Sequence, residues 1–188
     1  MPTYLYLNIG LSTDAALLVP IIGMLAMMVF LPVAGAVSDR VGRKPLWWFS
    51  LIGLIVAGIP MFLLMATGPL GAVIGFAVLG LLYVPQLATI SAAFPAMFPT
   101  QVRFAGFAIA YNVSTSLFGG TAPAVNDAMA QSTGDNLFPA YYMMGACLIG
   151  ALALIKVPET ARCPISGTEV PGTPDAPAQL EYVSPAGR

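Results

Sequence analysis

Long apolar runs alternate with short polar segments along most of this chain, and their only charged residue is Lys156, near the end of the last run. Five of these runs reach about twenty residues, the length that a helix needs to cross about 30 Å of hydrocarbon. They occupy residues 15–37, 46–66, 70–93, 104–125 and 138–157. The pattern predicts an all-α integral membrane fold with five transmembrane helices.

The segments between the runs are short and contain turn-forming residues. All of them include proline, glycine, asparagine or aspartate, and they lie at residues 38–45, 67–69, 94–103 and 126–136. Short connections place neighbouring helices antiparallel, so we expect residues 15–157 to form one bundle in lipid. We interpret residues 1–14 as the external end of a preceding helix or loop. Residues 158–188 are rich in proline, glycine, serine and threonine, which predicts a disordered cytoplasmic tail.

Composition narrows the classes of function. Charged residues make up 8% of the chain, whereas roughly a quarter of a soluble domain is charged. The sequence contains no histidine, and its two cysteines, Cys147 and Cys163, lie in an apolar run and in the polar tail. We therefore expect no disulfide framework, no metal site, no cofactor and no enzyme active site. Nucleic acid is not an expected partner either, because the few loop cations are mixed with Asp39.

The cations fall only on alternate connections, which predicts an orientation. Those near the apolar runs are Arg40, Arg43, Lys44, Arg103, Lys156 and Arg162, and the seventh, Arg188, is the last residue of the tail. The other connections carry only Asp14, Asp127 and Asp135. Because short cytoplasmic loops hold the excess of lysine and arginine, we expect an external N-terminus and a cytoplasmic C-terminus in the plasma or inner membrane.

The first cationic connection has the form G-x-x-x-D-R-x-G-R-K, in the segment GAVSDRVGRKP that begins at Gly35. Gly35 lets the end of one helix approach a neighbour, and Gly42 permits a tight turn. Asp39 can accept hydrogen bonds from the N–H groups at the positive end of another helix. The cations can pair with carboxylates or lipid headgroups, although a purely topogenic role also explains them.

This loop resembles the signature of the major facilitator superfamily of secondary transporters. Residues 98–123 (FPTQVRFAGFAIAYNVSTSLFGGTAP) are similar to a run of its metabolite:proton symporter branch, which includes carriers for shikimate, α-ketoglutarate, citrate, and proline or betaine. Residues 157–162 (VPETAR) resemble an element that follows the last span in sugar-porter-like members. The resemblance implies that the five spans correspond to spans 8–12 of a twelve-helix fold that is incomplete at the N-terminus.

In this superfamily the signature loop latches the two halves of the transporter on the cytoplasmic side. The resemblance therefore implies a conformational latch made of Gly35, Asp39, Arg40, Gly42, Arg43 and Lys44. Members commonly carry a glutamate and an arginine where this chain has Ala96 and Gln101. A cytoplasmic ion-pair network of Arg103, Glu159 and Arg162 is a further expectation.

Candidate substrate residues come from the third and fourth runs, because transporters of this plan hold their substrate near the bilayer midplane. We predict Tyr83, Gln86, Tyr111 and Asn112. An uncompensated amide in hydrocarbon costs several kcal/mol, so Gln86 must face a partner or water, and an interhelical hydrogen bond is an equal alternative. Tyr111 and Asn112 differ by about 100° around a helix, so both cannot point straight into one cavity.

Glycine and proline positions also allow two interpretations. Gly71 and Gly75 form a G-x-x-x-G pattern, and Gly119, Gly120 and Pro123 lie together in the fourth run. Both groups are typical of close helix packing, and the second can also be a hinge.

These features lead to one function hypothesis with two alternatives. We expect part of a transporter that couples protons to the uptake of small organic acids or zwitterionic metabolites by alternating access. Its partners are the lipid bilayer, the solute, protons and the missing N-terminal half of the same transporter. No aspartate, glutamate, lysine, arginine or histidine lies well inside the runs, so the coupling residue would belong to that half. The alternatives are a sugar porter or facilitator of the same fold, and a truncated membrane fragment that transports nothing.

Overall fold

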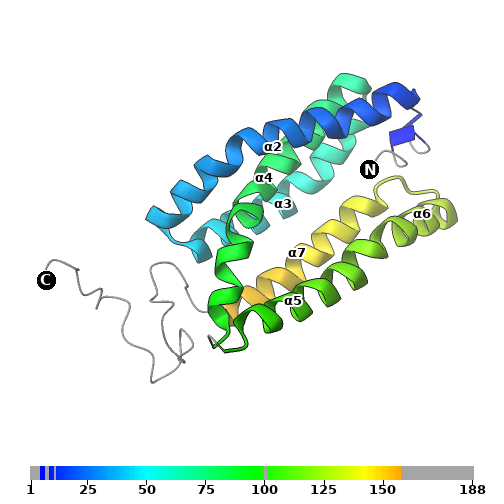
Figure 1. Cartoon of the computed structure of the whole chain (residues 1–188). Coiled ribbons are helices and arrows are strands. Elements are labelled where there is room, and N and C mark those ends of the chain that lie inside the picture. Colours follow the sequence, from blue (N-terminus) through cyan, green and yellow to red (C-terminus); the bar gives the residue numbers. More distant parts are fainter. Residues whose placement is uncertain (1–4, 7–8, 11, 100, 158–188) are drawn as a thin grey trace, which may run out of the picture.

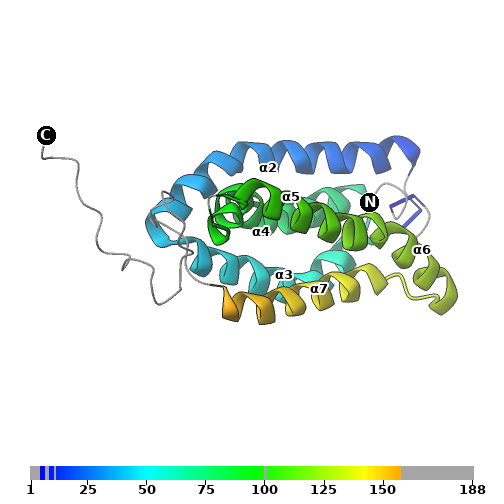
Figure 2. The ribbon, with the colours of Figure 1, turned by 60° about the horizontal axis from the view of Figure 1, so that its bottom comes forward.

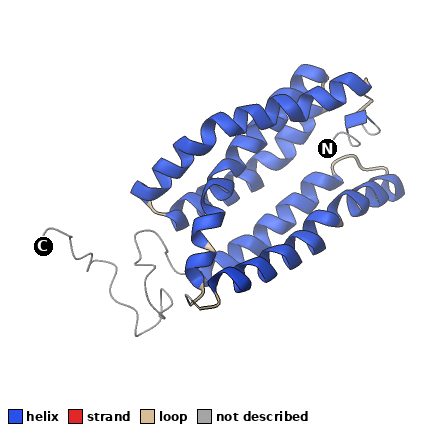
Figure 3. Ribbon diagram, in the orientation of Figure 1, coloured by secondary structure: helices blue, strands red, loops and turns tan. Residues whose placement is uncertain are grey.

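The computed structural model describes residues 5–6, 9–10, 12–99 and 101–157, and the regular elements within these ranges are helices (Figures 1 and 3). The α-helices are α2 (Thr13–Val41), α3 (Arg43–Met65), α4 (Pro69–Ala93), α5 (Arg103–Ser114), α6 (Ala122–Thr133) and α7 (Phe138–Lys156). A short 3₁₀ turn, η1 (Pro95–Met97), follows α4, and a π-helical segment, η2 (Thr115–Gly120), joins α5 to α6. The prediction of an all-α fold is confirmed.

Four described helices, α2, α3, α4 and α7, are long and apolar enough to cross a membrane. They match four of the predicted spans, although α2 and α3 extend further into the cationic connection than the apolar runs do. Only Gly42 separates these two helices, and its φ of 105° is in the region that favours glycine. Pro45 is tolerated in the first turn of α3 because that turn has no intrahelical partners for its N–H groups.

The predicted span at residues 104–125 is helical but is not a single α-helix. It is a rod of three parts, α5, η2 and α6, that extends to Thr133, so most of the expected connection at residues 126–136 is helical too (Figure 2). The π segment ends at the two glycines Gly119 and Gly120, ahead of Pro123, which cannot donate a backbone hydrogen bond. The hydroxyls of Thr115 and Thr121 donate to the carbonyls of Tyr111 and Leu117, which stabilises the irregular backbone.

The helices pack around α3, which contacts α4 on one side and α7 on the other, while α2 packs against α4. The core includes Leu51 and Leu54 of α3, Leu79 of α4 and Cys147 of α7. The glycines of α4 permit its close approach to α3. A Cβ atom on Gly71 would overlap the Leu64 carbonyl, and one on Gly75 would lie 2.8 Å from the Met61 carbonyl oxygen. The packing interpretation of this G-x-x-x-G pattern agrees with the structure.

The outward faces of the bundle are apolar. Met28 and Val29 of α2 are each 70% exposed, and Leu70 at the start of α4 is 74% exposed. Such a surface would be unstable in water and is suited to lipid. The α5 helix differs from the others because, among the described residues, it packs mainly against its neighbours in the chain, η1 and η2.

Candidate solute-binding site

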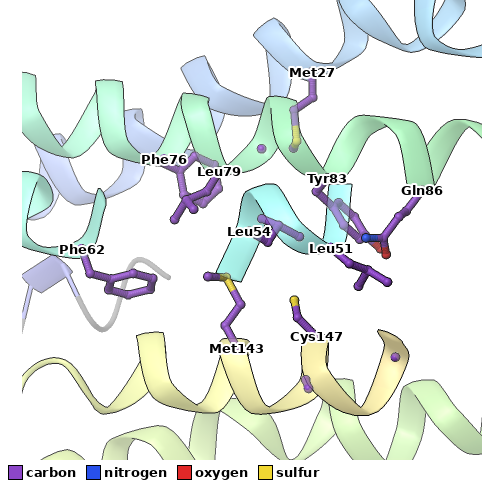
Figure 4. Close-up of a pocket in the computed structure, with 13 residues that line it drawn as sticks. Met27, Leu51, Leu54, Phe62, Phe76, Leu79, Tyr83, Gln86, Met143 and Cys147 are labelled. Atoms are coloured by element: carbon purple, nitrogen blue, oxygen red, sulfur yellow. The ribbon is translucent and has the colours of Figure 1, made fainter. Parts of the chain in front are cut away.

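Two cavities lie on either side of Tyr83 in α4. The first has a volume of about 450 Å³ and lies between α2, α3, α4 and α7. Figure 4 shows that Met143 and Cys147 of α7 point toward Leu51 and Leu54 of α3, with Tyr83 and Gln86 at one end. Its walls are otherwise apolar, so Tyr83 and Gln86 provide its polar side chains.

Gln86 connects α4 to α3 through a short chain of hydrogen bonds. Its Nε2 atom donates to Ser50 Oγ at 2.8 Å, and Ser50 Oγ donates to the Leu82 carbonyl at 2.5 Å. Ser50 is completely buried. The amide of Gln86 therefore makes the interhelical hydrogen bond that was one of the two alternatives from the sequence. Gln86 also lines the first cavity, which is compatible with the other alternative, contact with a substrate.

The second cavity has a volume of about 490 Å³ and lies between the C-terminal end of α4, η1, α5 and η2. Six aromatic residues line it, namely Tyr83, Phe94, Phe98, Phe107, Tyr111 and Phe118. Several of these rings are in contact. The ring centroids of Phe94 and Phe107 are 6.4 Å apart, and those of Phe107 and Tyr111 are 5.5 Å apart. None of the residues that line either cavity is charged.

The four predicted substrate residues do not form one group. Tyr83 lines both cavities, Gln86 lines the first, and Tyr111 lines the second. Asn112 lines neither cavity, and its Nδ2 atom donates to the Ala108 carbonyl of its own helix at 2.7 Å. Tyr111 and Asn112 therefore point to different sides of their helix, as their angular separation predicted. The role of all four residues in binding stays a prediction.

The sequence interpretation missed the phenylalanines of the second cavity. Phenylalanine in an apolar run is usually a core or lipid-facing residue, so its presence alone gave no indication of a site. A signal was present in the spacing. Phe107, Tyr111 and Phe118 follow one another at intervals of four and seven residues, which places them on one face of a helix.

The two cations in the first turn of α3, just after the α2–α3 turn at Gly42, bind the C-terminal ends of two other helices. Arg43 Nη1 donates to the Ala92 carbonyl of α4 at 3.2 Å. Lys44 Nζ donates to the Val157 carbonyl at 2.8 Å and to the Ile155 carbonyl at 3.3 Å, both at the end of α7. The last carbonyls of a helix lack intrahelical partners and carry partial negative charge, so both cations stabilise these ends.

The other residues of the predicted latch lie in the last turns of α2. Gly35 accepts a hydrogen bond from Ser38 Oγ at 2.8 Å, Arg40 lies exposed in the last turn of α2, and Asp39 lies beside it. Arg103 is buried, and its Nε atom donates to the Phe98 carbonyl at 3.3 Å, which closes the turn before α5. Glu159 and Arg162, the expected partners of Arg103, lie outside the described residues.

Comparison with known proteins decides the family. Residues 1–169 match the family described as sugar (and other) transporter. The chain belongs to this family, which is part of the major facilitator superfamily. The resemblance of the loop from Gly35 to Pro45 is thereby confirmed, and so is the expectation that the chain is not an enzyme.

Individual relatives of known function show which transporters the chain resembles. The ectoine/proline transporter ProP of Corynebacterium glutamicum is 39% identical over 171 residues, which are 89% of this chain and 34% of the relative. The proline/betaine transporter of Escherichia coli K12 is 33% identical over 168 residues, 89% of this chain and 33% of the relative. The chain thus spans about one third of the length of these relatives. No solved structure shows significant similarity.

Proposed function

We propose that this chain forms part of a secondary active transporter for small zwitterionic solutes, which works by alternating access. The observation that carries the proposal is the uncharged cavity of aromatic and hydroxyl side chains between α4 and α5. The relatives named as ectoine, proline and betaine transporters support this class of solute. Their names describe those proteins, and the chain corresponds to about a third of each.

The lining of the cavity favours a zwitterion over the other candidate solutes. An organic acid anion needs a basic partner when it leaves water, and neither cavity has one in its lining. A sugar needs many hydrogen-bonding groups, whereas the second cavity is mainly aromatic and apolar. A zwitterion has no net charge, so aromatic faces and a few hydroxyls can accommodate it. The sugar porter remains the second candidate because the family description includes sugars.

The position of the cations supports the proposed orientation. The hydrogen bonds of Arg43 and Lys44 bring the loop between α2 and α3 to the ends of α4 and α7, and Lys156 lies at that end of α7. Figure 1 shows the α6–α7 connection, which has Asp127 and Asp135 nearby, at the opposite end. We infer that the cationic end faces the cytoplasm, with the N-terminus outside.

Proton coupling is part of the proposal and requires residues beyond those described. The described segments that span the membrane hold no aspartate or glutamate well inside the bilayer. A proton-linked transporter needs a titratable group along its path. We therefore assign the coupling residue to the rest of the transporter, the N-terminal half that this proposal requires as a partner.

Uptake by proteoliposomes tests this function. The full-length gene product that contains this chain is reconstituted, and entry of labelled proline and glycine betaine is followed with and without an inward proton gradient. We expect accumulation only with the gradient, and its loss after a protonophore is added. Equal uptake without the gradient would remove the proton coupling. Uptake of a hexose but of neither zwitterion would favour the sugar porter, and a product that moves no solute would favour the non-transporting fragment.

A further inference from the structure

The first cavity, between α2, α3, α4 and α7, is apolar along most of its length and polar at one end. Figure 4 shows Tyr83 and Gln86 at this end and Phe62 at the other, with apolar side chains between them. We propose that this cavity binds a membrane lipid that has one hydrocarbon chain and an uncharged hydroxyl headgroup. The ligand is a component of the bilayer and not a transported solute, so the proposal goes beyond the proposed function.

The hydrogen bonds of Ser50 determine which atom of the Gln86 amide is left for a ligand. Ser50 Oγ has one proton, which it donates to the Leu82 carbonyl, so the amide atom that contacts Ser50 is the donor Nε2. The other amide atom, Oε1, is an acceptor and has no hydrogen bond within the described part of the chain, and the same holds for the Tyr83 hydroxyl. A hydroxyl headgroup can therefore donate to Gln86 Oε1 and accept from Tyr83.

The dimensions of the cavity suit a single hydrocarbon chain. Leu51 and Phe62 both line it and are eleven residues apart on α3, which corresponds to about 16 Å along the helix axis. Since an extended chain advances about 3.6 Å per three bonds, twelve carbons and a hydroxyl oxygen span about 14 Å. The volume of about 450 Å³ is about three times that of an apolar cavity that holds one benzene molecule. The cavity thus has the length and the volume for one such chain.

The cavity opens at the depth of the hydrocarbon. Ala146 lines it, is exposed in the described part of the chain, and lies near the middle of α7. An apolar molecule can therefore reach the cavity from the bilayer without crossing water. None of the lining residues is charged, so a charged headgroup would lose its hydration without gaining an ionic partner. This lining favours a headgroup without charge.

Packing contacts and the headgroup together supply the affinity. Moving a chain from the bilayer into an apolar cavity has no hydrophobic driving force, because lipid tails are as apolar as leucine. The gain comes from dispersion contacts with the walls and from the hydrogen bonds of the headgroup. Met27 and Met143 line the walls, and their unbranched side chains adapt to the shape of a bound chain. We therefore expect the headgroup to decide which single-chain lipids bind.

Protection of Cys147 tests whether a lipid chain occupies the cavity. Its thiol is free and lines the cavity. The full-length gene product, with Cys147 as its only cysteine, is placed in phosphatidylcholine nanodiscs. Its modification by methyl methanethiosulfonate, a small apolar thiol reagent, is followed by mass spectrometry. We expect 1-dodecanol to slow the modification saturably, by about 10-fold at ten times its dissociation constant.

Two results of this experiment would overturn the proposal. If Cys147 is not modified in the absence of the alcohol, small apolar molecules do not reach the cavity. If the alcohol leaves the rate of modification unchanged, it does not bind there. The modification requires no transport, so neither result depends on the proposed function.

Two further probes test the headgroup, with all concentrations expressed per phospholipid. 1-Methoxyundecane is an isomer of 1-dodecanol without the O–H donor, and dodecane-1-sulfonate has a charged headgroup. We expect the ether to protect Cys147 with an apparent dissociation constant about 3- to 5-fold higher than that of the alcohol. The sulfonate is expected not to protect. Protection by the ether or by the sulfonate that equals protection by the alcohol would contradict the uncharged hydroxyl headgroup.

Gln86→Leu then locates the headgroup. This variant removes the acceptor Oε1 and keeps a side chain of similar size, so the alcohol and the ether should protect Cys147 equally. Gln131→Leu makes the same change at an exposed position of α6 and is expected to keep the preference for the alcohol. A preference that persists in Gln86→Leu would place the headgroup elsewhere. The comparison of the probes in the unchanged protein tests the proposal even if Gln86→Leu does not fold.

Discussion

Ser50 is the residue on which the polar contact between α3 and α4 depends, because it accepts from Gln86 and donates to the Leu82 carbonyl. Replacing it in Ser50→Ala leaves the amide of Gln86 without this partner in an apolar environment. We expect the free energy of unfolding to fall by about 1–2 kcal/mol. Thermal unfolding of the full-length gene product in detergent measures this change. Ser91→Ala is the matched control, since Ser91 is exposed near the end of α4, and equal melting temperatures for both variants would contradict the role of Ser50.

Lys44 connects the start of α3 to the C-terminal end of α7, because its amine donates to the carbonyls of Ile155 and Val157. Lys44→Met keeps most of the side-chain volume but removes the interaction with the α7 carbonyls, which is expected to cost about 1 kcal/mol of stability. Arg40→Met removes the same charge from an exposed position in α2 and is the control for loop charge alone. An equal fall of the melting temperature in both variants would show that only the total charge of the loop matters. If the fall is specific to Lys44→Met, we expect Lys44→Arg to keep the melting temperature of the unchanged protein.

Single residues also show where sequence reasoning succeeded and where it stopped. Tyr83 and Gln86 were found because a polar group in an apolar span requires a partner, and this is a property of the residue itself. Phe94 was not found, because its importance comes from Trp47 and Phe107, which reach it from other helices. Contacts of this kind depend on tertiary packing, which the apolar pattern does not specify.

At the level of the elements, Gly71 tests the fit between α3 and α4. A Cβ atom there would overlap the Leu64 carbonyl, and backbone atoms cannot move aside cheaply. Gly71→Ala is therefore expected to destabilise the protein by about 1–3 kcal/mol. Gly120→Ala is the control, because a Cβ atom on Gly120 has open space around it. Measured melting temperatures should fall for the first variant alone, and a stable Gly71→Ala variant would show that the two helices are not this close.

The helices themselves were largely predictable, whereas the break in the fourth span was not. Apolar length predicted α2, α3, α4 and α7 because each must satisfy its backbone inside a bilayer. The run from 104 to 125 has the same apolar character, and its glycines allowed either packing or a hinge. Which of these the chain adopts depends on small differences in backbone hydrogen bonding, such as the bonds from Thr115 and Thr121 to the carbonyls of Tyr111 and Leu117.

For the whole molecule, orientation decides whether the cavities and the cationic end can act as proposed. The α2–α3 turn and the end of α6 lie at opposite ends of the bundle (Figures 1 and 2). Single cysteines at Val41, which is 59% exposed, and at Ser132, which is exposed, report on these two ends in a background with Cys147 and Cys163 replaced by alanine.

A membrane-impermeant maleimide should label the Ser132→Cys variant in intact cells and the Val41→Cys variant only after the membrane is permeabilised. The physical reason is that Arg40, Arg43 and Lys44 resist transfer across the membrane, so the end that carries them stays in the cytoplasm. The reverse pattern would place the cationic turn outside, together with the ends of α4 and α7 that Arg43 and Lys44 bind, and would contradict the proposed orientation. Labelling of both sites in intact cells would mean that the chain does not cross the bilayer three times between them, as α3, α4 and the rod of α5, η2 and α6 require.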